Sequence, residues 1–365
     1  MLRYEIALTF LPGIGDITGK KLVAYCGGIE AVFKLSRREL CEIKALGEPL
    51  VHRLLEGRDD ALKRASMEMS FIERYDIKPL FFLHKEYPFR LYQCPDGPVM
   101  LYYKGNADLN AAKVIGVVGT RRATAYGQEA CMKLIDDLSD LDVMIVSGLA
   151  FGIDSVAHKQ ALRWDLPTVG VLGHGLDRLY PPQNRSLAEK MIRNGGLLTD
   201  FPMKTLPDRE NFPKRNRIIA GLCDALVVVE AAEKGGALIT ADIAGSYDRD
   251  VFAFPGRIND EFSKGCNRYI RTNRAALIES AQDLLFMMGW DKTKGTDKGR
   301  QTHLFVDLSA SELSVVELIR KHKDPGVDLL SKESQISASH MAKLLLELEF
   351  KGIVKCLPGK RYQLV

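Results

Sequence analysis

Residues 114–127 read VIGVVGTRRATAYG, and this stretch decides the class of fold. Its first five residues are all apolar or glycine, the pattern of a strand that is buried on both faces of a parallel sheet. The strand ends at Gly119, and a helical pattern begins near Gly127. A buried strand that passes through a glycine turn into a helix is the repeating unit of a doubly wound α/β domain.

The same unit recurs through the middle of the chain. Four more continuous apolar segments of strand length lie at 143–146, 168–172, 225–229 and 251–254. Helical patterns lie between or beside them, at 128–138, 155–163, 184–194 and 238–247. We therefore expect residues 76–290 to form an α/β domain built on a doubly wound parallel sheet.

The flanking residues have different textures. Residues 1–75 carry short amphipathic helical runs separated by glycines, and the FLPGIG stretch at 10–15 resembles the turn of a helix-hairpin-helix. Glycine N–H groups in such a turn contact phosphate, although a plain turn between helices explains the stretch equally well. The polar run DKTKGTDKGRQT, which starts at Asp291, predicts a flexible linker over 291–305.

The last block, residues 306–365, has the pattern of a winged helix. Ser309 or Ser311 can cap a helix that bears Leu313, Val316 and Ile319. A second helix after Ser337 places apolar side chains on one face, at Met341, Leu344, Leu345 and Leu348. Alternating residues around Pro358 and Gly359 then predict a hairpin.

Composition narrows the function classes. The chain has 365 residues, 46% of them hydrophobic, and no apolar run approaches the ~20 residues of a membrane span. Its seven cysteines are odd in number and never form C-x-x-C, which argues against a disulfide framework and a cysteine-rich zinc site and favours a reducing cytoplasm. The net charge of +4 does not by itself indicate nucleic acid, so a nucleic-acid site would need locally concentrated cations.

The first candidate site is the turn at Gly119. Loops at the carboxyl ends of parallel strands bind anions, glycine lets the backbone approach a ligand closely, and the Arg121 guanidinium matches phosphate oxygens. Neither the dinucleotide fingerprint nor a P-loop is present. An ordinary turn with solvated arginines explains the residues equally well.

The second candidate is IVSGLAFGIDSVAHKQAL, residues 145–162, where a buried strand runs into Ser147 and Gly148. A serine, Asp154 and His158 invite a hydrolase interpretation. We reject it because the residues are sequence neighbours and G-x-S-x-G is absent. Asp154 is expected to cap a helix, and His158 to pack in it.

The third candidate spans residues 211–244. Lys214, Arg215 and Arg217 open a helix, where cations oppose the helix dipole and call for an anion to offset them. Phe212 beside them is the aromatic partner that stacks a base in single-stranded nucleic acid, although plain packing explains it equally well. Gly235 and Gly236 open a later helix and form a further candidate phosphate cradle.

Several motifs together resemble one family. VVGTR with a following YG, SGLAFGIDSVAH, LDRLYPPQN, FPKRNRIIAGL, GGALITA and FPGR occur in this order over residues 114–275. In this combination they look like the DNA-processing protein A family (DprA, also called Smf). The resemblance implies an extended Rossmann-like domain in a cytoplasmic protein of natural transformation. Such a protein binds and protects incoming single-stranded DNA, loads the RecA recombinase and works against single-strand-binding protein.

The resemblance also implies a homodimer through the sheet domain, and neither catalysis, cofactor nor metal. Carried over by position, Arg121 and Lys214 would contact phosphates, and Asn216 and Arg217 belong to the same motif as Lys214. We count Phe212, Ser147, Gly148, Gly235 and Gly236 with them as nucleic-acid-binding candidates.

Two other functions stay open. The α/β core resembles phosphoribohydrolases of nucleoside monophosphates, but their P-G-G-x-G-T-x-x-E signature is matched at 234–242 without its third glycine and glutamate, so Asp242 would have to serve as the acid. A transcription regulator acting through the winged helix would leave the large α/β domain unexplained.

Overall fold

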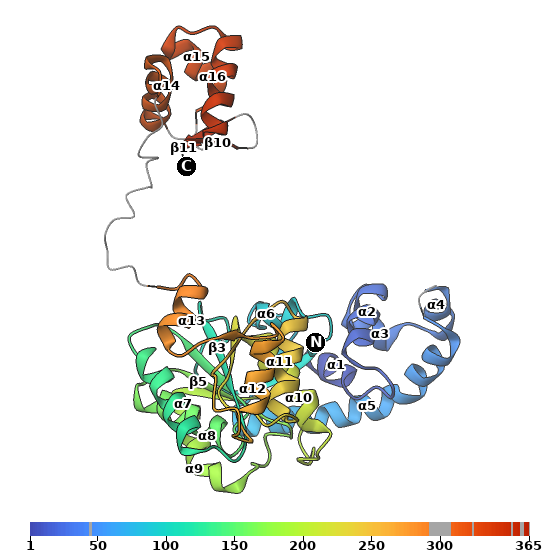
Figure 1. Ribbon diagram of the computed structural model, residues 1–365. Helices are drawn as coiled ribbons and strands as arrows, with labels where there is room; N and C mark the ends of the chain where they lie inside the picture. The colour runs from blue at the N-terminus through green and yellow to red at the C-terminus, as the bar shows by residue number, and fades with distance from the viewer. Residues whose placement is uncertain (44–45, 292–307, 323–324, 352, 358–360, 365) are drawn as a thin grey trace. The chain divides into compact units, whose positions relative to one another are not determined.

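The structure is a computed structural model of the whole chain. It describes all residues except 44–45, 292–307, 323–324, 352, 358–360 and 365. The chain divides into two compact units, residues 1–291 and 292–365 (Figure 1).

A nine-stranded sheet organises the first unit, with the strand order β1-β2-β6-β5-β4-β3-β7-β8-β9. The seven strands from β6 to β9 in this order run parallel to their neighbours. The chain starts the parallel part at β3, proceeds outward to β6, and then returns to the other side of β3 with β7. Strand order therefore reverses between β3 and β7, which makes this the switch point of the sheet. The bounds are β1 (Lys78–Phe81), β2 (Met100–Gly105), β3 (Val114–Val118), β4 (Met144–Ser147), β5 (Thr168–Val171), β6 (Gly195–Thr199), β7 (Ala225–Val228), β8 (Asp250–Ala253) and β9 (Ala276–Leu277).

Helices cover both faces of this sheet because its strands are apolar on both faces. Val114 and Val118 of β3 belong to one core together with side chains of α10, α11 and α12. Ile115 and Val117 of the same strand belong to a second core with side chains of α7, α8 and α13. The α/β fold with a large, mostly parallel sheet is therefore confirmed. The helices are α6 (Phe89–Tyr92), α7 (Ala125–Asp137), α8 (Ile153–Arg163), α9 (Arg185–Arg193), α10 (Asn211–Leu222), α11 (Gly236–Ser246), α12 (Lys264–Arg271) and α13 (Ala281–Met287), with a short 3-10 helix, η1 (Pro182–Asn184).

The sheet is larger than the sequence pattern predicts, and it is not wholly parallel. Strands β1, β2, β6 and β9 have no counterpart among the predicted segments, and β2 pairs antiparallel with both β6 and β1. Strand β6 was missed because it begins with Gly195 and Gly196, residues that weaken a strand pattern. Glycine is needed there, because Gly195 has a φ of 138° and a Cβ on Gly196 would lie 2.4 Å from Cε2 of Tyr103 on the partner strand.

One predicted helix cap is wrong. Gly152, with φ of 75°, is the N-cap of α8, and Asp154 lies within the first turn of the helix. The Asp154 side chain instead accepts a hydrogen bond from the backbone N–H of Ala150 at 3.3 Å. Glycine takes the cap position because a left-handed backbone is costly for other residues.

Residues 1–75 are helical and share the core of the sheet. The helices are α1 (Leu2–Leu8), α2 (Asp16–Tyr25), α3 (Ile29–Lys34), α4 (Arg37–Glu42) and α5 (Glu48–Tyr75). Side chains of α1 and α5, such as Ile6 and Leu54, belong to the same apolar core as β2 and β3. The turn between α1 and α2 contains Gly13, whose φ is 70°.

The second unit contains three helices and a two-stranded antiparallel sheet: α14 (Ala310–Lys321), α15 (Val327–Ser334), α16 (Ala338–Phe350), β10 (Val354–Leu357) and β11 (Arg361–Leu364). Ser309 caps α14 in a capping box with Glu312. Met341, Leu344, Leu345 and Leu348 are buried as predicted, whereas Leu313 is 50% exposed. The predicted linker after Asp291 and the turn at Pro358 and Gly359 lie outside the described residues.

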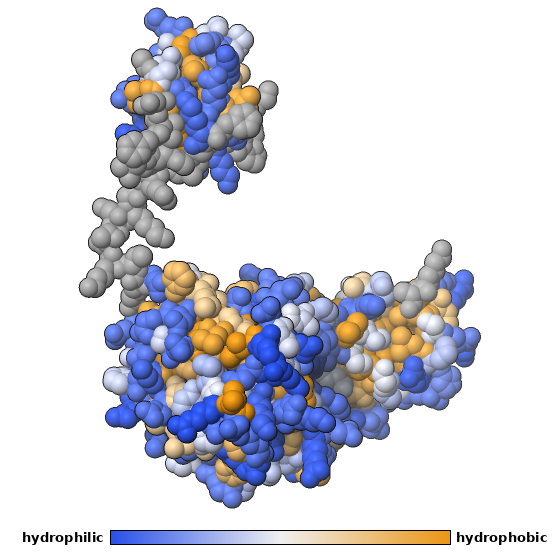
Figure 2. All heavy atoms as spheres, in the orientation of Figure 1, coloured by the Kyte–Doolittle hydropathy of each residue, from blue (hydrophilic) through white to orange (hydrophobic). Residues whose placement is uncertain are grey.

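The surface of the molecule is mostly hydrophilic, as expected when the apolar side chains are buried in these cores. Figure 2 shows hydrophilic side chains over most of the visible face, with apolar side chains gathered in separate patches. Within the described ranges, no helix combines the length and apolar character that crossing a bilayer requires.

Candidate nucleic-acid interface

A pocket of about 760 Å³ opens where β3 and β7 end, at the switch point of the sheet. Four segments supply most of its lining: 118–122 after β3, 207–219 leading into α10, 231–240 before and in α11, and 261–262 before α12. Ligands of open α/β sheets bind in this position, because the strand ends and the helix N-termini converge there.

An arginine and an aromatic ring form one wall of the pocket. The Arg121 guanidinium lies over the ring of Phe212, 5.3 Å from the ring centroid. The Tyr180 ring lies 6.0 Å from Phe212 and also lines the pocket. A cation beside exposed aromatic surface can hold a phosphate and stack a base at the same time.

Exposed cations outnumber carboxylates around this pocket. Its lining includes the exposed Arg121, Arg122, Arg209 and Lys234. The two carboxylates in the lining, Asp154 and Glu261, both face a neighbouring arginine: Arg215 for Asp154, and Arg122 for Glu261 at 3.5 Å. Unpaired positive charge therefore remains for an anionic ligand.

The floor of the pocket is built on a buried arginine. Arg215 donates hydrogen bonds to the carbonyl oxygens of Gly148, at 2.6 Å, and Val171, which tie α10 to the ends of β4 and β5. Burial lowers the pKa of Arg215 to about 10, while Asp154 opposes the shift, so the guanidinium stays charged at neutral pH. Burial raises the pKa of Asp154, and Arg215 lowers it in turn.

Glycines shape the pocket in two ways. A Cβ on Gly148 would lie 2.4 Å from Nη1 of Arg215, so glycine at this position admits the floor arginine. Gly235 and Gly236 begin α11 at the pocket, and a Cβ on Gly236 would meet no atom within 4 Å. Asn216 donates from Nδ2 to the Gly236 carbonyl oxygen at 3.4 Å, which fixes this turn against α10.

Of the nine predicted binding residues, five line the pocket: Arg121, Phe212, Asn216, Gly235 and Gly236. Gly148 contributes to the floor through Arg215. Ser147 is fully buried, and its Oγ donates to the Val117 carbonyl oxygen at 2.6 Å, so it joins β4 to β3. Lys214 is exposed and does not itself line the pocket, although its neighbours Pro213 and Arg215 do.

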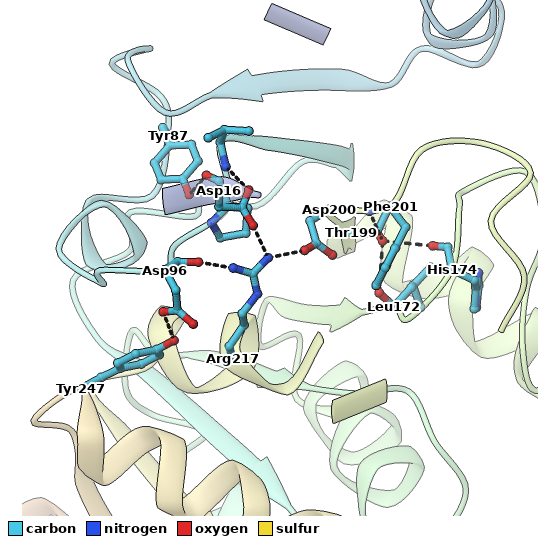
Figure 3. A network of polar contacts seen from close by, with 12 residues as sticks. Asp16, Tyr87, Asp96, Leu172, His174, Thr199, Asp200, Phe201, Arg217 and Tyr247 are labelled. Carbon is cyan, nitrogen blue, oxygen red and sulfur yellow. Dashed lines mark hydrogen bonds and ion pairs between the residues drawn. The ribbon is translucent and has the colours of Figure 1, made fainter. Parts of the chain in front are cut away.

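Arg217 lies away from the pocket, in a buried network (Figure 3). Its Nη2 donates to Asp16 at 2.9 Å and to Asp200 at 2.6 Å, and its Nη1 donates to the Asp96 carbonyl oxygen. The Asp96 carboxylate accepts a hydrogen bond from the Tyr247 hydroxyl. Arg217 therefore joins α2, the end of β6 and α10, and its described contacts are structural.

The residues of the rejected hydrolase interpretation do not form a proton relay. His158 is fully buried and its Nδ1 lies 2.6 Å from Oγ1 of Thr168, while Ser155 donates to the Ala150 carbonyl oxygen at 2.5 Å. Burial lowers the pKa of His158 to about 3. The prediction that His158 packs within its helix is confirmed. Asp242, the acid that a phosphoribohydrolase would need, pairs with Arg274 at 3.1 Å and is absent from the pocket lining.

Several pocket residues were not predicted from the sequence, among them Tyr180, Arg209 and Phe262. Tyr180 lies within the LDRLYPPQN motif, which contributes to the family resemblance but does not by itself indicate a binding role for this tyrosine. Arg209 and Phe262 lie in loops. A loop has no hydrophobic periodicity, so its sequence does not indicate which residues it will contact in the folded protein.

The fold and the pocket define a class: a doubly wound α/β protein with a cationic, aromatic pocket at the switch point of its sheet. The model of the DNA recombination-mediator protein A family matches residues 78–289, so this chain belongs to that family of DNA-processing proteins. The resemblance drawn from the motifs is confirmed. Protein Smf of Synechocystis sp. is 32% identical over 99% of this chain and 98% of its own length. The DNA processing protein DprA of Streptococcus pneumoniae is 37% identical over 69% of this chain and 93% of its own.

Solved structures agree with this assignment. DNA processing protein A from Streptococcus pneumoniae has a TM-score of 0.68 at 36% identity and covers 78% of this chain and 98% of that one. DNA processing protein A from Helicobacter pylori, solved for its single-stranded DNA binding mode, has a TM-score of 0.53 at 26% identity and covers 59% of this chain and 96% of that one.

Proposed function

We propose that this protein binds single-stranded DNA in the switch-point pocket during natural transformation, protects it in the cytoplasm and loads RecA onto it. The observation that carries the proposal is the Arg121 guanidinium over the Phe212 ring, within a pocket rimmed by exposed cations. The single-stranded DNA binding mode described for the Helicobacter pylori protein supports the same ligand for this chain.

Different residues of the pocket contact the phosphates and the bases of the strand. Arg121 holds one phosphate, and the backbone N–H groups at Gly235 and Gly236, at the start of α11, offer a second phosphate cradle. Lys214, exposed beside the pocket, is placed to contact the backbone of a strand that leaves it. A base stacks on Phe212. None of these contacts reads a base edge, so binding has little sequence preference.

We propose that the protein is not an enzyme and needs neither cofactor nor metal. The buried carboxylate in the pocket lining, Asp154, is held by Arg215 and the Ala150 N–H, and the buried His158 faces Thr168. In the described part of the chain no group of three or more His, Cys, Asp and Glu side chains could hold a metal ion.

Assembly and partners extend the proposal. The family resemblance is the ground for proposing a homodimer through the α/β domain, and two linked pockets on one strand would then gain from effective concentration. RecA is the partner that receives the strand, and single-strand-binding protein is its competitor. The α1–α2 turn acts as a helix-hairpin-helix, and the second unit acts as a winged helix. Light scattering tests the homodimer. RecA filament assembly on strands covered with single-strand-binding protein tests RecA loading.

Fluorescence anisotropy with a labelled oligothymidylate tests the central claim. The labelled single strand should bind tightly, and neither duplex DNA nor mononucleotides should displace it readily. The affinity for the single strand should fall steeply as the salt concentration rises, because each phosphate contact displaces counterions. A parallel incubation with nucleoside monophosphates should release no free base. Salt-independent binding or a preference for one duplex sequence would contradict single-strand binding, and base release would favour a hydrolase.

A further inference from the structure

A second groove adjoins the switch-point pocket. It has a volume of about 820 Å³ and is lined by Thr124, Ala125, Tyr126, Pro255, Gly256, Arg257 and Asp260. Two chain segments pass from one hollow to the other. The segment after β3 lines the pocket with 118–122 and the groove with 124–126, and the segment after β8 lines the groove with 255–257 and 260 and the pocket with 261–262.

The boundary between the two hollows is a weak ion pair. Arg122 and Glu261 lie 3.5 Å apart, with 77% and 68% of their side chains exposed. Exposed pairs of this kind contribute little, because solvent screens them and both side chains lose freedom. A phosphate can therefore replace Glu261 as the partner of Arg122, and a strand can pass across this point.

Tyr126 presents a fixed aromatic face in the groove. The residue is 47% exposed, and its hydroxyl donates to the Pro255 carbonyl oxygen at 2.5 Å. The next residue, Gly256, is itself held by two hydrogen bonds with the Asn267 side chain, at 3.1 and 2.8 Å. The ring is thus anchored to rigid backbone, so stacking on it costs little conformational entropy.

An unpaired cation accompanies this ring. Arg257 is exposed and forms no ion pair with any residue that the structure describes. Asp260 is the acidic residue in the groove lining and lies in the same turn, where its backbone N–H donates to the Arg257 carbonyl oxygen at 3.1 Å, but its carboxylate forms no ion pair with Arg257, so the guanidinium can still take a phosphate. A fixed aromatic face beside a free guanidinium repeats the chemistry of Phe212 and Arg121.

We propose that this groove is a second nucleotide site for the same single strand, in which a base stacks on Tyr126 and a phosphate contacts Arg257. The inference rests on the proposed function, since it continues the strand out of the switch-point pocket past Arg122. It makes the binding site longer than the pocket alone, so a minimal oligonucleotide fills the pocket and only a longer one reaches Tyr126.

Binding of oligothymidylates of increasing length to the full chain tests the proposal. Tyr126→Ala should weaken binding about five-fold or more for long strands and leave the shortest bound strand unaffected, the size expected for one stacked base. Tyr126→Phe keeps the ring but loses the hydroxyl that anchors it to Pro255, so its affinity for long strands should lie between those of Tyr126→Ala and the unaltered chain. Tyr92→Ala is the matched control. Tyr92 is 58% exposed on α6, whose Arg90 pairs with Asp224 just before β7, at the opposite edge of the sheet.

A second measurement needs no variant. Photocrosslinking of the unaltered chain with 5-iodouracil placed at successive positions of a long strand should attach one position to Tyr126. Equal affinity of Tyr126→Ala and the unaltered chain at every length, or no crosslink to Tyr126 from any position, would overturn the second site while the proposed function stands. Failure of the unaltered chain to bind any single strand would overturn the proposed function and this inference with it.

Discussion

At the scale of single residues, Arg121 and Lys214 test where the strand runs. Arg121→Ala removes a phosphate contact and the cation over Phe212, and should cost about 1–3 kcal/mol of binding free energy. Lys214→Ala should act in the same direction, and the double variant should nearly abolish binding. The loss should be alike for all sequences, and the salt dependence should fall by about one contact for each cation removed. Anisotropy titrations at several salt concentrations measure both quantities.

The control for these variants is another exposed arginine. Arg185 on α9 has 81% of its side chain exposed and does not line the pocket, so Arg185→Ala should bind like the unaltered chain. The melting temperature should not change in any of these variants, because exposed cations contribute little to stability. If the double variant at Arg121 and Lys214 bound DNA normally, the DNA site would have to lie at the α1–α2 turn or in the second unit.

The sequence predicts the residues that act through their own loop, and it fails for those that act through distant partners. Gly119, Arg121 and Phe212 were found because a buried strand or a helix start fixes their place at the edge of the sheet. Arg217 has the same local pattern as Lys214, but its partner Asp16 is 201 positions away, and no local rule predicts that ion pair. The Ser147 hydroxyl likewise donates its hydrogen bond to the neighbouring strand, at Val117, rather than to a ligand.

At the scale of elements, α10 carries both the binding face and a structural cross-link. Arg217→Met leaves the Asp200 carboxylate, 11% exposed, without its cation. Removing one partner of a buried ion pair is far more costly than removing both, so we expect a loss of about 3 kcal/mol in the free energy of unfolding. Adding Asp200→Asn should recover part of it. Urea unfolding measures the change.

An exposed ion pair of the same unit provides the comparison. Arg274 and Asp242 lie 3.1 Å apart with 61% and 52% of their side chains exposed. Arg274→Ala should therefore cost less than about 1 kcal/mol. Equal losses in Arg217→Met and Arg274→Ala would show that the network around Arg217 does not stabilise the fold as inferred.

Helix α5 reaches the loop between β6 and α10 through Glu68. Both of its carboxylate oxygens accept the Met203 N–H, at 3.0 and 3.1 Å, and burial raises the pKa of Glu68 to about 7. Between about pH 4.5 and 7 the folded protein keeps a proton that the unfolded chain releases, so stability falls as pH rises through this range. Glu68→Gln should remove that fall, at most about 3 kcal/mol.

Urea unfolding of Glu68→Gln and of the unaltered chain across this pH range measures the difference. Glu73→Gln, on an exposed position of the same helix, is the control and should leave the pH dependence unchanged. The comparison between variants is needed because His158, whose pKa burial lowers to about 3, acts in the opposite direction over part of the range. Parallel curves for Glu68→Gln and the unaltered chain would contradict the inferred protonation of Glu68.

At the scale of the whole molecule, the two units are built as separate structures. Among the residues that the structure describes, the core of the second unit is formed by side chains from Leu308 onward, such as Val315, Leu330 and Leu345. The described residues that line the switch-point pocket lie between 118 and 262, in the first unit.

A chain that ends at Asp291 should therefore fold and bind on its own. We expect its unfolding transition to match one of two transitions in calorimetry of the full chain, since each unit has its own core. Its affinity for a short oligothymidylate that fills only the pocket should equal that of the full chain, because no lining residue has been removed. Binding titrations and calorimetry on the two chains check this. A tenfold loss of affinity in the shorter chain, with its fold intact, would mean that the second unit contacts the strand directly.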